Sequence, residues 1–338
     1  MKAKEYTFDA SYQPQVRTKT DTSRIMLDVI IALVPAMAVA VYQFGFRVLA
    51  LIVVSVLSCV FFEWGYRKLM KKPDSIGDLS ACVTGVLIAM VIPSGAPLWM
   101  PVVAAAFAMV VVKQLYGGIG KNFLNPALAS RAFLMASWPV IMTTWAVPKA
   151  LQGSVDATTM ATPLSYLKAG EALPDTLGTV NMLLGNVPGC IGEISAAALL
   201  IGGAYLLIRK VISWRIPAAF IGTVAVVTFI FPMHGASNFD WMLTNLLSGG
   251  LLLGAFFMAT DYSSSPVTLN GQLLYGFGCG ALTVLIRYFG GFPEGVSYAI
   301  LIMNLCAWAI DKGTRGRQFG VTKEDLKAAK KAAKEAKA

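Results

Sequence analysis

The first long apolar stretch of the chain is "IMLDVIIALVPAMAVAVYQF", residues 25–44, and it contains one charged residue, Asp28. A helix that crosses a lipid bilayer needs about 20 mostly apolar residues, which this stretch supplies. The whole chain of 338 residues has the same character, with 56% hydrophobic and 14% charged residues and a mean hydropathy of +0.64. Soluble domains contain about a quarter charged residues. The composition therefore predicts an all-α polytopic protein embedded in a lipid bilayer.

Apolar runs of comparable length recur along the chain. The nine further runs are 46–65, 78–93, 98–115, 126–146, 190–209, 214–232, 241–260, 271–289 and 296–310. We therefore predict about ten transmembrane helices. With the N-terminus in the cytoplasm, 24 of the 28 Lys and Arg residues fall on the inner side and 4 on the outer side. Cytoplasmic loops are enriched in Lys and Arg, so both termini are predicted to be cytoplasmic.

The ten runs divide the chain into five parts. They are a cytoplasmic N-terminal segment (1–24), helices 1–5 (25–146), an external loop (147–189), helices 6–10 (190–310) and a basic cytoplasmic tail (311–338). The N-terminal segment has no apolar core, and no small-residue cleavage site follows it, so no cleaved signal peptide is predicted. The net charge is +10, and the tail holds nine of the 28 Lys and Arg residues. The tail contains a single aromatic residue, Phe319, and no series of aromatic residues that could stack on bases, so it suits anionic lipid rather than nucleic acid.

Two glycine-containing stretches resemble each other. "KQLYGGIGKNFLNPALASRAF" (113–133) links the fourth and fifth predicted helices, and "IRYFGGFPEGVSYAILIMN" (286–304) links the ninth and tenth. Each has a basic residue, an aromatic residue before Gly-Gly, and an interrupted run into the next helix. Two five-helix halves of opposite orientation would form the inverted repeats common in membrane transport proteins. Chance similarity between glycine-rich loops is the alternative.

The cysteine and histidine content limits the metal centres that this chain could hold alone. None of the five cysteines forms a CxxC pair, and four lie inside apolar runs, which indicates structural burial. An iron–sulfur centre is therefore not predicted. His234 is the only histidine, which excludes a haem with two histidine ligands from this chain.

The long external loop contains the polar stretch "DATTMATPL", residues 156–164. Thr, Asp and Pro are common in solvated turns, which is the simple interpretation. A covalent attachment site is the alternative. Because a threonine hydroxyl is a poor nucleophile, a separate transferase would have to activate it and to read a local motif such as Asp156 followed by Thr162.

Two further polar stretches lie beside predicted helices. In "KNFLNPALASR", Asn125 precedes Pro126, which indicates helix capping and does not explain Asn122. In "TDYSSSPVT", Asp261 and Ser264 lie near a proline break and could form a cap or a turn. Ionisable residues within membrane helices are costly and suggest function. By position we single out four of them: Asp28, Glu63, Lys113 and Glu193. Glu63 and Lys113 lie near helix ends, where extension to the membrane surface would explain them.

Five segments together resemble one family of membrane subunits over essentially the whole chain. That family comprises the D subunit of the Rnf electron-transport complex and the B subunit of the sodium-pumping NADH:quinone reductase. The segments are "DATTMAT" from Asp156, "SRIMLDVIIALVPA" from Ser23, "GGIGKNFLNPALASRAF" from Gly117, "GAFFMATDYSSSPVT" from Gly254 and "GGFPEGVSYAILIMN" from Gly290. The chain length and the short N-terminal segment are more similar to the Rnf protein.

The resemblance implies a covalent FMN. In this family a flavin transferase joins FMN to a threonine through a phosphoester, at a motif that Asp156 and Thr162 match here. Met160 departs from the motif, which usually has a small residue at that place. The alternative acceptors are Thr158, Thr159 and Ser165. A tether in an external loop keeps the anionic phosphate out of hydrocarbon.

The resemblance also implies a second flavin, a non-covalent riboflavin held in the membrane part. Asn122, Asn125, Asp261 and Ser264 are the residues expected to contact it. The expected function is electron relay within a bacterial cytoplasmic-membrane complex that exchanges electrons between ferredoxin and NAD⁺ and moves Na⁺ or H⁺. The chain has no Gly-x-Gly-x-x-Gly unit, so the substrate sites would lie on other subunits.

Two other functions remain as alternatives at the level of sequence. Ten helices in inverted halves would also serve a small-solute transporter or channel without redox function. The chain could also be a structural membrane scaffold for other redox subunits. A flavin on Thr162 would distinguish the relay from the transporter, and its effect on electron transfer would distinguish the relay from the scaffold.

Overall fold

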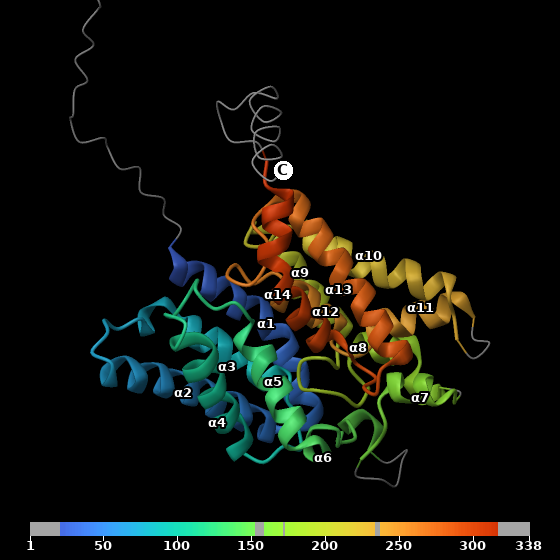
Figure 1. The fold of residues 1–338 in the computed structure, drawn as a ribbon. Helices are drawn as coiled ribbons and strands as arrows, with labels where there is room; N and C mark the ends of the chain where they lie inside the picture. Colours follow the sequence, from blue (N-terminus) through green and yellow to red (C-terminus); the bar gives the residue numbers. More distant parts are fainter. Residues whose placement is uncertain (1–20, 153–158, 172, 234–236, 317–338) are drawn as a thin grey trace, which may run out of the picture.

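The computed structural model describes residues 21–152, 159–171, 173–233 and 237–316, and within them the chain is helical (Figure 1). The predicted all-α class is confirmed: these residues form helices and two isolated β-bridges, with no β-strand. The helices are α1 (Thr22–Phe44), α2 (Phe46–Leu69), α3 (Ser80–Met90), α4 (Trp99–Ala106), α5 (Pro126–Ser137), α6 (Pro139–Met142), α7 (Pro163–Ala169), α8 (Thr179–Leu184), α9 (Ala196–Ile208), α10 (Arg215–Ile230), α11 (Asn238–Leu247), α12 (Leu251–Leu253), α13 (Leu269–Phe289) and α14 (Val296–Thr314), with two π-helices, η2 (Phe107–Gln114) and η5 (Gly254–Met258), and three short 3₁₀-helices, η1 (Ile76–Asp78), η3 (Lys149–Leu151) and η4 (Asp175–Leu177).

Helix length decides which elements could cross a membrane alone. Within the described ranges three helices, α1, α2 and α13, are long and apolar enough, and a fourth span results if the bent pair α11 and α12–η5 is counted as one. Four shorter apolar helices of 10–17 residues accompany them, namely α3, α4–η2, α9 and α10. The prediction of ten spans in inverted halves is not confirmed by these lengths. The two Gly-Gly stretches that suggested the inverted repeat also differ in backbone conformation, since Gly117 has φ +112° and Gly290 has φ −77°.

The helix predicted over 241–260 is broken. Residues Asn238–Leu247 and Leu251–Met258 meet at an angle of 59°. Gly249 and Gly250, with φ of +65° and +62°, occupy the break, where a side chain would be strained. Arg287 of α13 donates to the carbonyl oxygens of Asn245 (2.6 Å), Ser248 (3.3 Å) and Gly249 (3.2 Å). The guanidinium therefore satisfies carbonyls that the broken helix leaves without partners.

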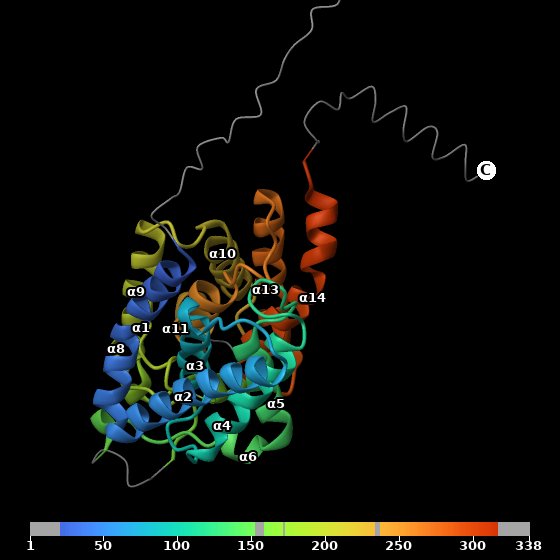
Figure 2. The ribbon, with the colours of Figure 1, turned by 90° about the vertical axis from the view of Figure 1, so that its left-hand side faces the viewer.

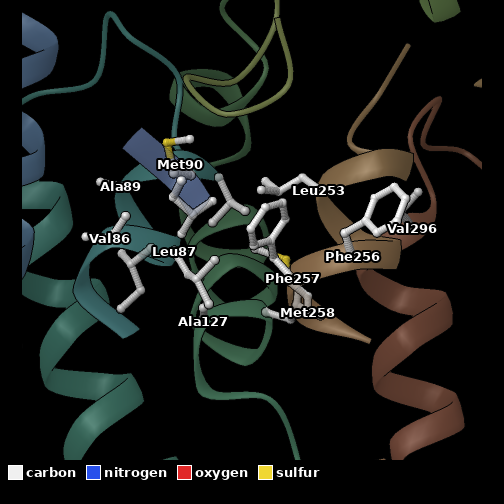
Figure 3. Packing of buried hydrophobic residues seen from close by; sticks show 14 of the residues in the cluster. Val86, Leu87, Ala89, Met90, Ala127, Leu253, Phe256, Phe257, Met258 and Val296 are labelled. Carbon is white, nitrogen blue, oxygen red and sulfur yellow. The ribbon is translucent and has the colours of Figure 1, made fainter. Parts of the chain in front are cut away.

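The core joins the N-terminal and C-terminal helices. α1 packs against α9, α2 against α3, and α10 against α13. At the centre, Leu87 and Met90 of α3 belong to the same cluster as Phe257 of η5 and Ala127 of α5 (Figure 3). The half-length helix α3 and the broken helix thus meet in one apolar cluster. The two ends of the described chain, at the start of α1 and the end of α14, lie at the same end of the molecule, and α6 lies at the opposite end (Figures 1 and 2).

The connection between α6 and α9 is ordered over its described residues. Leu164 and Leu167 of α7 pack with Trp241 of α11, and a second small cluster includes Leu177 of η4 and Met182 of α8. Trp241 Nε1 also donates to Tyr288 Oη at 2.8 Å. These contacts hold α7 against the C-terminal helices, which places the Thr162 stretch beside α5 and α14.

Helix packing at Gly202 of α9 gives the first prediction. A Cβ added there would lie 2.1 Å from the backbone oxygen of Ala32 in α1, and small residues permit such close approach between membrane helices. We expect Gly202→Ala to lower the melting temperature of the purified protein in detergent, with a destabilisation of about 1–3 kcal/mol from overpacking. Gly222→Ala in α10 is the matched control, because nothing lies within 4 Å of a Cβ there. Equal melting temperatures for both variants would contradict this packing.

Candidate functional site

Thr162 is the N-cap residue of α7. Its Oγ1 accepts a hydrogen bond from the backbone N–H of Ser165 at 3.3 Å and lies 2.8 Å from Ser165 Oγ. Pro163 follows at the first helical position, where its missing N–H costs no hydrogen bond. Thr162 is 6% exposed. Asp156, the predicted acid of the motif, and Thr158, an alternative acceptor, lie outside the described residues.

A cavity of about 470 Å³ lies beside this N-cap. One wall is the extended stretch Thr159–Ala161, held by a β-bridge between Ala146 and Thr159 and by the hydrogen bond from Met160 N to Trp145 O (3.1 Å). The lining also contains Phe292 and Tyr298, whose rings stack with centroids 5.5 Å apart. The lining includes Ser165 and Thr159 and does not include Thr162 itself. The Thr162 hydroxyl therefore reaches the cavity through its contact with Ser165.

The polar wall of the cavity is a buried charged cluster. Arg131 of α5 donates to Glu193 Oε1 at 2.8 Å, to the Glu294 carboxylate, and to Cys190 Sγ at 3.4 Å. Arg131 and Glu294 both line the cavity. Arg287 reaches the same region, where its Nε donates to the Glu294 backbone oxygen at 3.1 Å. Cavities of this size with an apolar lining and a few polar groups are typical of ligand sites.

Sequence reasoning missed Arg131 and Glu294 as site residues. Both lie inside stretches that it singled out, "KNFLNPALASR" and "GGFPEG", and each is a charge in or beside an apolar run. That combination was a usable signal, because buried charges need a specific partner. Of the predicted ionisable residues, Glu193 belongs to this cluster and the other three do not.

The other three form ion pairs elsewhere. Asp28 of α1 accepts from Tyr205 Oη (2.9 Å) and pairs with Arg209 (3.1 Å), both on α9. Glu63 and Lys113 pair at 3.0 Å and are buried. The expectation that these two extend to the membrane surface is therefore wrong. The ion pair explains why Glu63 and Lys113 are buried, since each charge supplies the partner that the other needs within the protein.

The residues predicted to hold a second flavin lie together around a small cavity. Asn122, Asn125 and Asp261 line a space of about 100 Å³, and Ser264 Oγ donates to Asp261 Oδ2 at 3.0 Å. Asn125 caps α5 as expected, accepting from the N–H groups of Ala127 and Leu128, and its Nδ2 donates to Met258 O at 3.2 Å. Removal from water raises the pKa of Asp261, and hydrogen bonds from Ser264, Ser263 and Asn122 oppose that rise.

This second cavity does not fit riboflavin as it stands. Ligand cavities commonly measure about 300–1,000 Å³, several times this volume. The polar atoms also have partners within the protein: Asn122 Nδ2 donates to Leu124 O at 3.0 Å, and Asn125 is occupied by capping. The structure therefore brings the four predicted residues together and gives each a structural role.

The charged cluster determines how stability depends on pH. Burial and the neighbouring Glu193 raise the pKa of Glu294 from 4.5 to about 7, against the opposing effect of Arg131 and Arg287. The folded state therefore binds this proton more tightly than the unfolded state. The contribution of this proton to the free energy of unfolding is fully present below pH 4.5. It is lost as pH rises to about 7, by at most about 3 kcal/mol.

We expect the melting temperature of the wild-type protein to fall more steeply between about pH 5 and pH 8 than that of Glu294→Gln, because glutamine does not titrate. Thermal unfolding in detergent at several pH values measures this. Glu171→Gln, which changes an exposed residue outside the cavity, is the control and should follow the wild type. Parallel curves for wild type and Glu294→Gln would show that Glu294 does not titrate in this range.

Comparison with known proteins assigns the chain to a family. A profile of the NQR2, RnfD, RnfE family matches residues 9–320. The D subunit of the Na⁺-translocating ferredoxin:NAD⁺ oxidoreductase complex of Acetobacterium woodii is 50% identical over 94% of this chain and 97% of its own length. The proton-translocating counterpart of Clostridium ljungdahlii is 41% identical over 94% and 97%. The D subunit of the ion-translocating oxidoreductase complex of Actinobacillus succinogenes is 34% identical over 93% and 98%. The chain therefore belongs to the NQR2, RnfD, RnfE family.

Proposed function

We propose that this chain is the D-type membrane component of an ion-translocating electron-transport complex of the ferredoxin:NAD⁺ oxidoreductase kind. The observation that carries the proposal is the 50% identity to a component of such a complex, with almost the full length of both chains aligned. The name of one related protein specifies Na⁺ and that of another specifies protons, so we propose ion translocation without specifying the ion. The chain would act with other subunits that bind ferredoxin and NAD⁺.

The membrane arrangement belongs to the same proposal. The proposal includes ten spans in two inverted halves, located in a bacterial cytoplasmic membrane. It also includes cytoplasmic termini and an external 147–189 loop, and this orientation accounts for the unequal distribution of Lys and Arg. The described chain ends lie at one end of the molecule and α6 at the other, which supports that arrangement (Figures 1 and 2). Short helices such as α3 and the broken pair α11 and α12–η5 are typical of transport proteins with discontinuous helices.

Thr162 would hold FMN through a phosphoester that a flavin transferase makes. The residues present fit such a group: a 470 Å³ cavity adjoins the Thr162–Ser165 hydroxyl pair, with stacked aromatic rings on one wall and the Arg131 guanidinium on another. When bound, FMN would supply one-electron acceptance and donation. The chain itself would fix the flavin beside Arg131 and shield it from water between Trp145 and Phe292.

Replacing Thr162 tests the attachment. Thr162→Asn keeps a good N-cap for α7 and removes the hydroxyl, so the fold should persist without the tether. We expect the wild-type protein, expressed with its transferase, to fluoresce under ultraviolet light as a denatured gel band, and the variant band to be dark. Thr176→Val is the matched control: Thr176 lies outside the motif and the cavity, and its band should stay fluorescent.

The outcomes separate the three candidate functions. A dark wild-type band would overturn the flavin relay and favour a transporter or channel. A fluorescent Thr162→Asn band would move the attachment to Thr158, Thr159 or Ser165. Unchanged electron transfer in an assembled complex that contains Thr162→Asn would favour a structural scaffold over a relay.

A second, non-covalent riboflavin at Asn122, Asn125, Asp261 and Ser264 is a separate part of the proposal. Because the cavity is small, we assign no electron-transfer step to it. If riboflavin binds there, denaturing the Thr162→Asn protein should release free flavin, and adding Asn122→Ala should reduce the amount at least several-fold. Chromatography of the released flavin measures this. No released flavin from the Thr162→Asn protein would exclude the second site.

A further inference from the structure

Two carboxylates share one guanidinium at the cavity beside Thr162. Arg131 binds Glu193 through one terminal nitrogen at 2.8 Å and Glu294 through the other. Carboxylate oxygens of Glu193 and Glu294 and the sulfur of Cys190 all lie within 4.8 Å of one another. Like charges at this spacing disfavour double ionisation, as in other paired carboxylates. The cluster therefore has room for one extra proton.

A metal ion is the other way to neutralise such a cluster, and the geometry does not favour it. Arg131 donates to Cys190, Glu193 and Glu294, the three groups that would have to ligate the ion. Its guanidinium already provides the positive charge among them. A divalent cation would have to displace a buried arginine whose charge would then have no partner, which is costly.

The groups around the cluster point to Glu294 as the residue that binds the proton. Its side chain is 14% exposed and lines the cavity, whereas that of Glu193 is 3% exposed. Arg287, from α13, is directed at the carbonyl oxygens of the α11 break and at the Glu294 backbone oxygen. Other titratable groups nearby are Cys190, which also contacts Arg131, Tyr298 of α14, which lines the cavity, and Lys168 of α7, whose Nζ donates to Gly290 O. Arg131 is thus the one guanidinium that hydrogen-bonds these carboxylates within the described residues.

We propose that Glu294 takes up a proton from water when the flavin in this cavity gains an electron and releases the proton when the flavin loses that electron. This inference rests on the proposed flavin at Thr162. The electron comes from a reduced one-electron carrier, an iron–sulfur centre or a flavin, and one proton moves from water onto a carboxylate oxygen of Glu294. The charge of the cavity is therefore unchanged by the step. Protonation of Glu294 removes one negative charge from the cluster, in which Arg131 stays paired with Glu193.

A protein without covalent flavin tests the proton-binding group alone. In Thr162→Asn, the infrared band of a protonated carboxyl group should disappear as pH rises through about 7, the pKa of Glu294. The band should be absent from Thr162→Asn with Glu294→Gln. Adding Glu193→Gln in place of Glu294→Gln should shift the midpoint to lower pH, because a neighbouring negative charge is removed. An unshifted or missing titration would overturn the assignment to Glu294.

The flavin-loaded protein tests the coupling. We expect the midpoint potential of the flavin, titrated with dithionite, to be equal in wild type and Glu294→Gln below about pH 5, where Glu294 is neutral. Above about pH 7 the wild-type potential should be the lower one, because ionised Glu294 opposes an added negative charge. Glu171→Gln is the matched control, and its potential should follow the wild type at every pH.

The infrared titration and the measurement of the flavin potential together distinguish failure of this inference from failure of the proposed function. A fluorescent band with equal potentials for wild type and Glu294→Gln at every pH would overturn the coupling alone. A dark wild-type band would overturn the flavin relay and the coupling with it, and the infrared titration would still report whether Glu294 binds the proton.

Discussion

The ion pairs of Arg131 are the interaction on which the arrangement around the candidate site depends. Arg131 belongs to α5, while its partners Glu193 and Glu294 precede α9 and α14. One buried guanidinium therefore fixes three segments that are far apart in the sequence. A buried charge without a partner costs several kcal/mol, so the three segments are stable only together. The cavity beside Thr162 lies among them.

A second buried arginine, Arg287, binds backbone carbonyl oxygens. The break between α11 and α12 leaves carbonyl oxygens unpaired, and Arg287 supplies their donors. Unpaired backbone groups are especially costly where water is scarce, because nothing else can bind them. Arg287 also contacts the Glu294 backbone, which connects the broken helix to the cluster around Arg131. The broken helix and the candidate site thus share the same polar groups.

Comparison of particular residues shows how far the sequence reached. Asn122, Asn125, Asp261 and Ser264 were expected near one another from the family resemblance and do lie together, where a hydrogen bond from Asn125 Nδ2 to Met258 O joins the two stretches. Glu63 and Lys113 were expected at the membrane surface and are instead a buried pair. Arg131 and Glu294 were not identified at all. Their partners are 62 and 163 residues away along the chain, and no local pattern reveals a pairing over that distance.

By itself the sequence determined the helical class, the apolar runs and the stretch from Asp156 to Thr162, since these depend on composition, periodicity and neighbouring residues. The tertiary structure decided that Thr162 caps α7, that its hydroxyl meets a cavity through Ser165, and that a shared arginine forms one wall of that cavity. It also decided where helices end and break. The physical reason is that burial and charge pairing are properties of segments brought together by folding, which residue order alone does not specify.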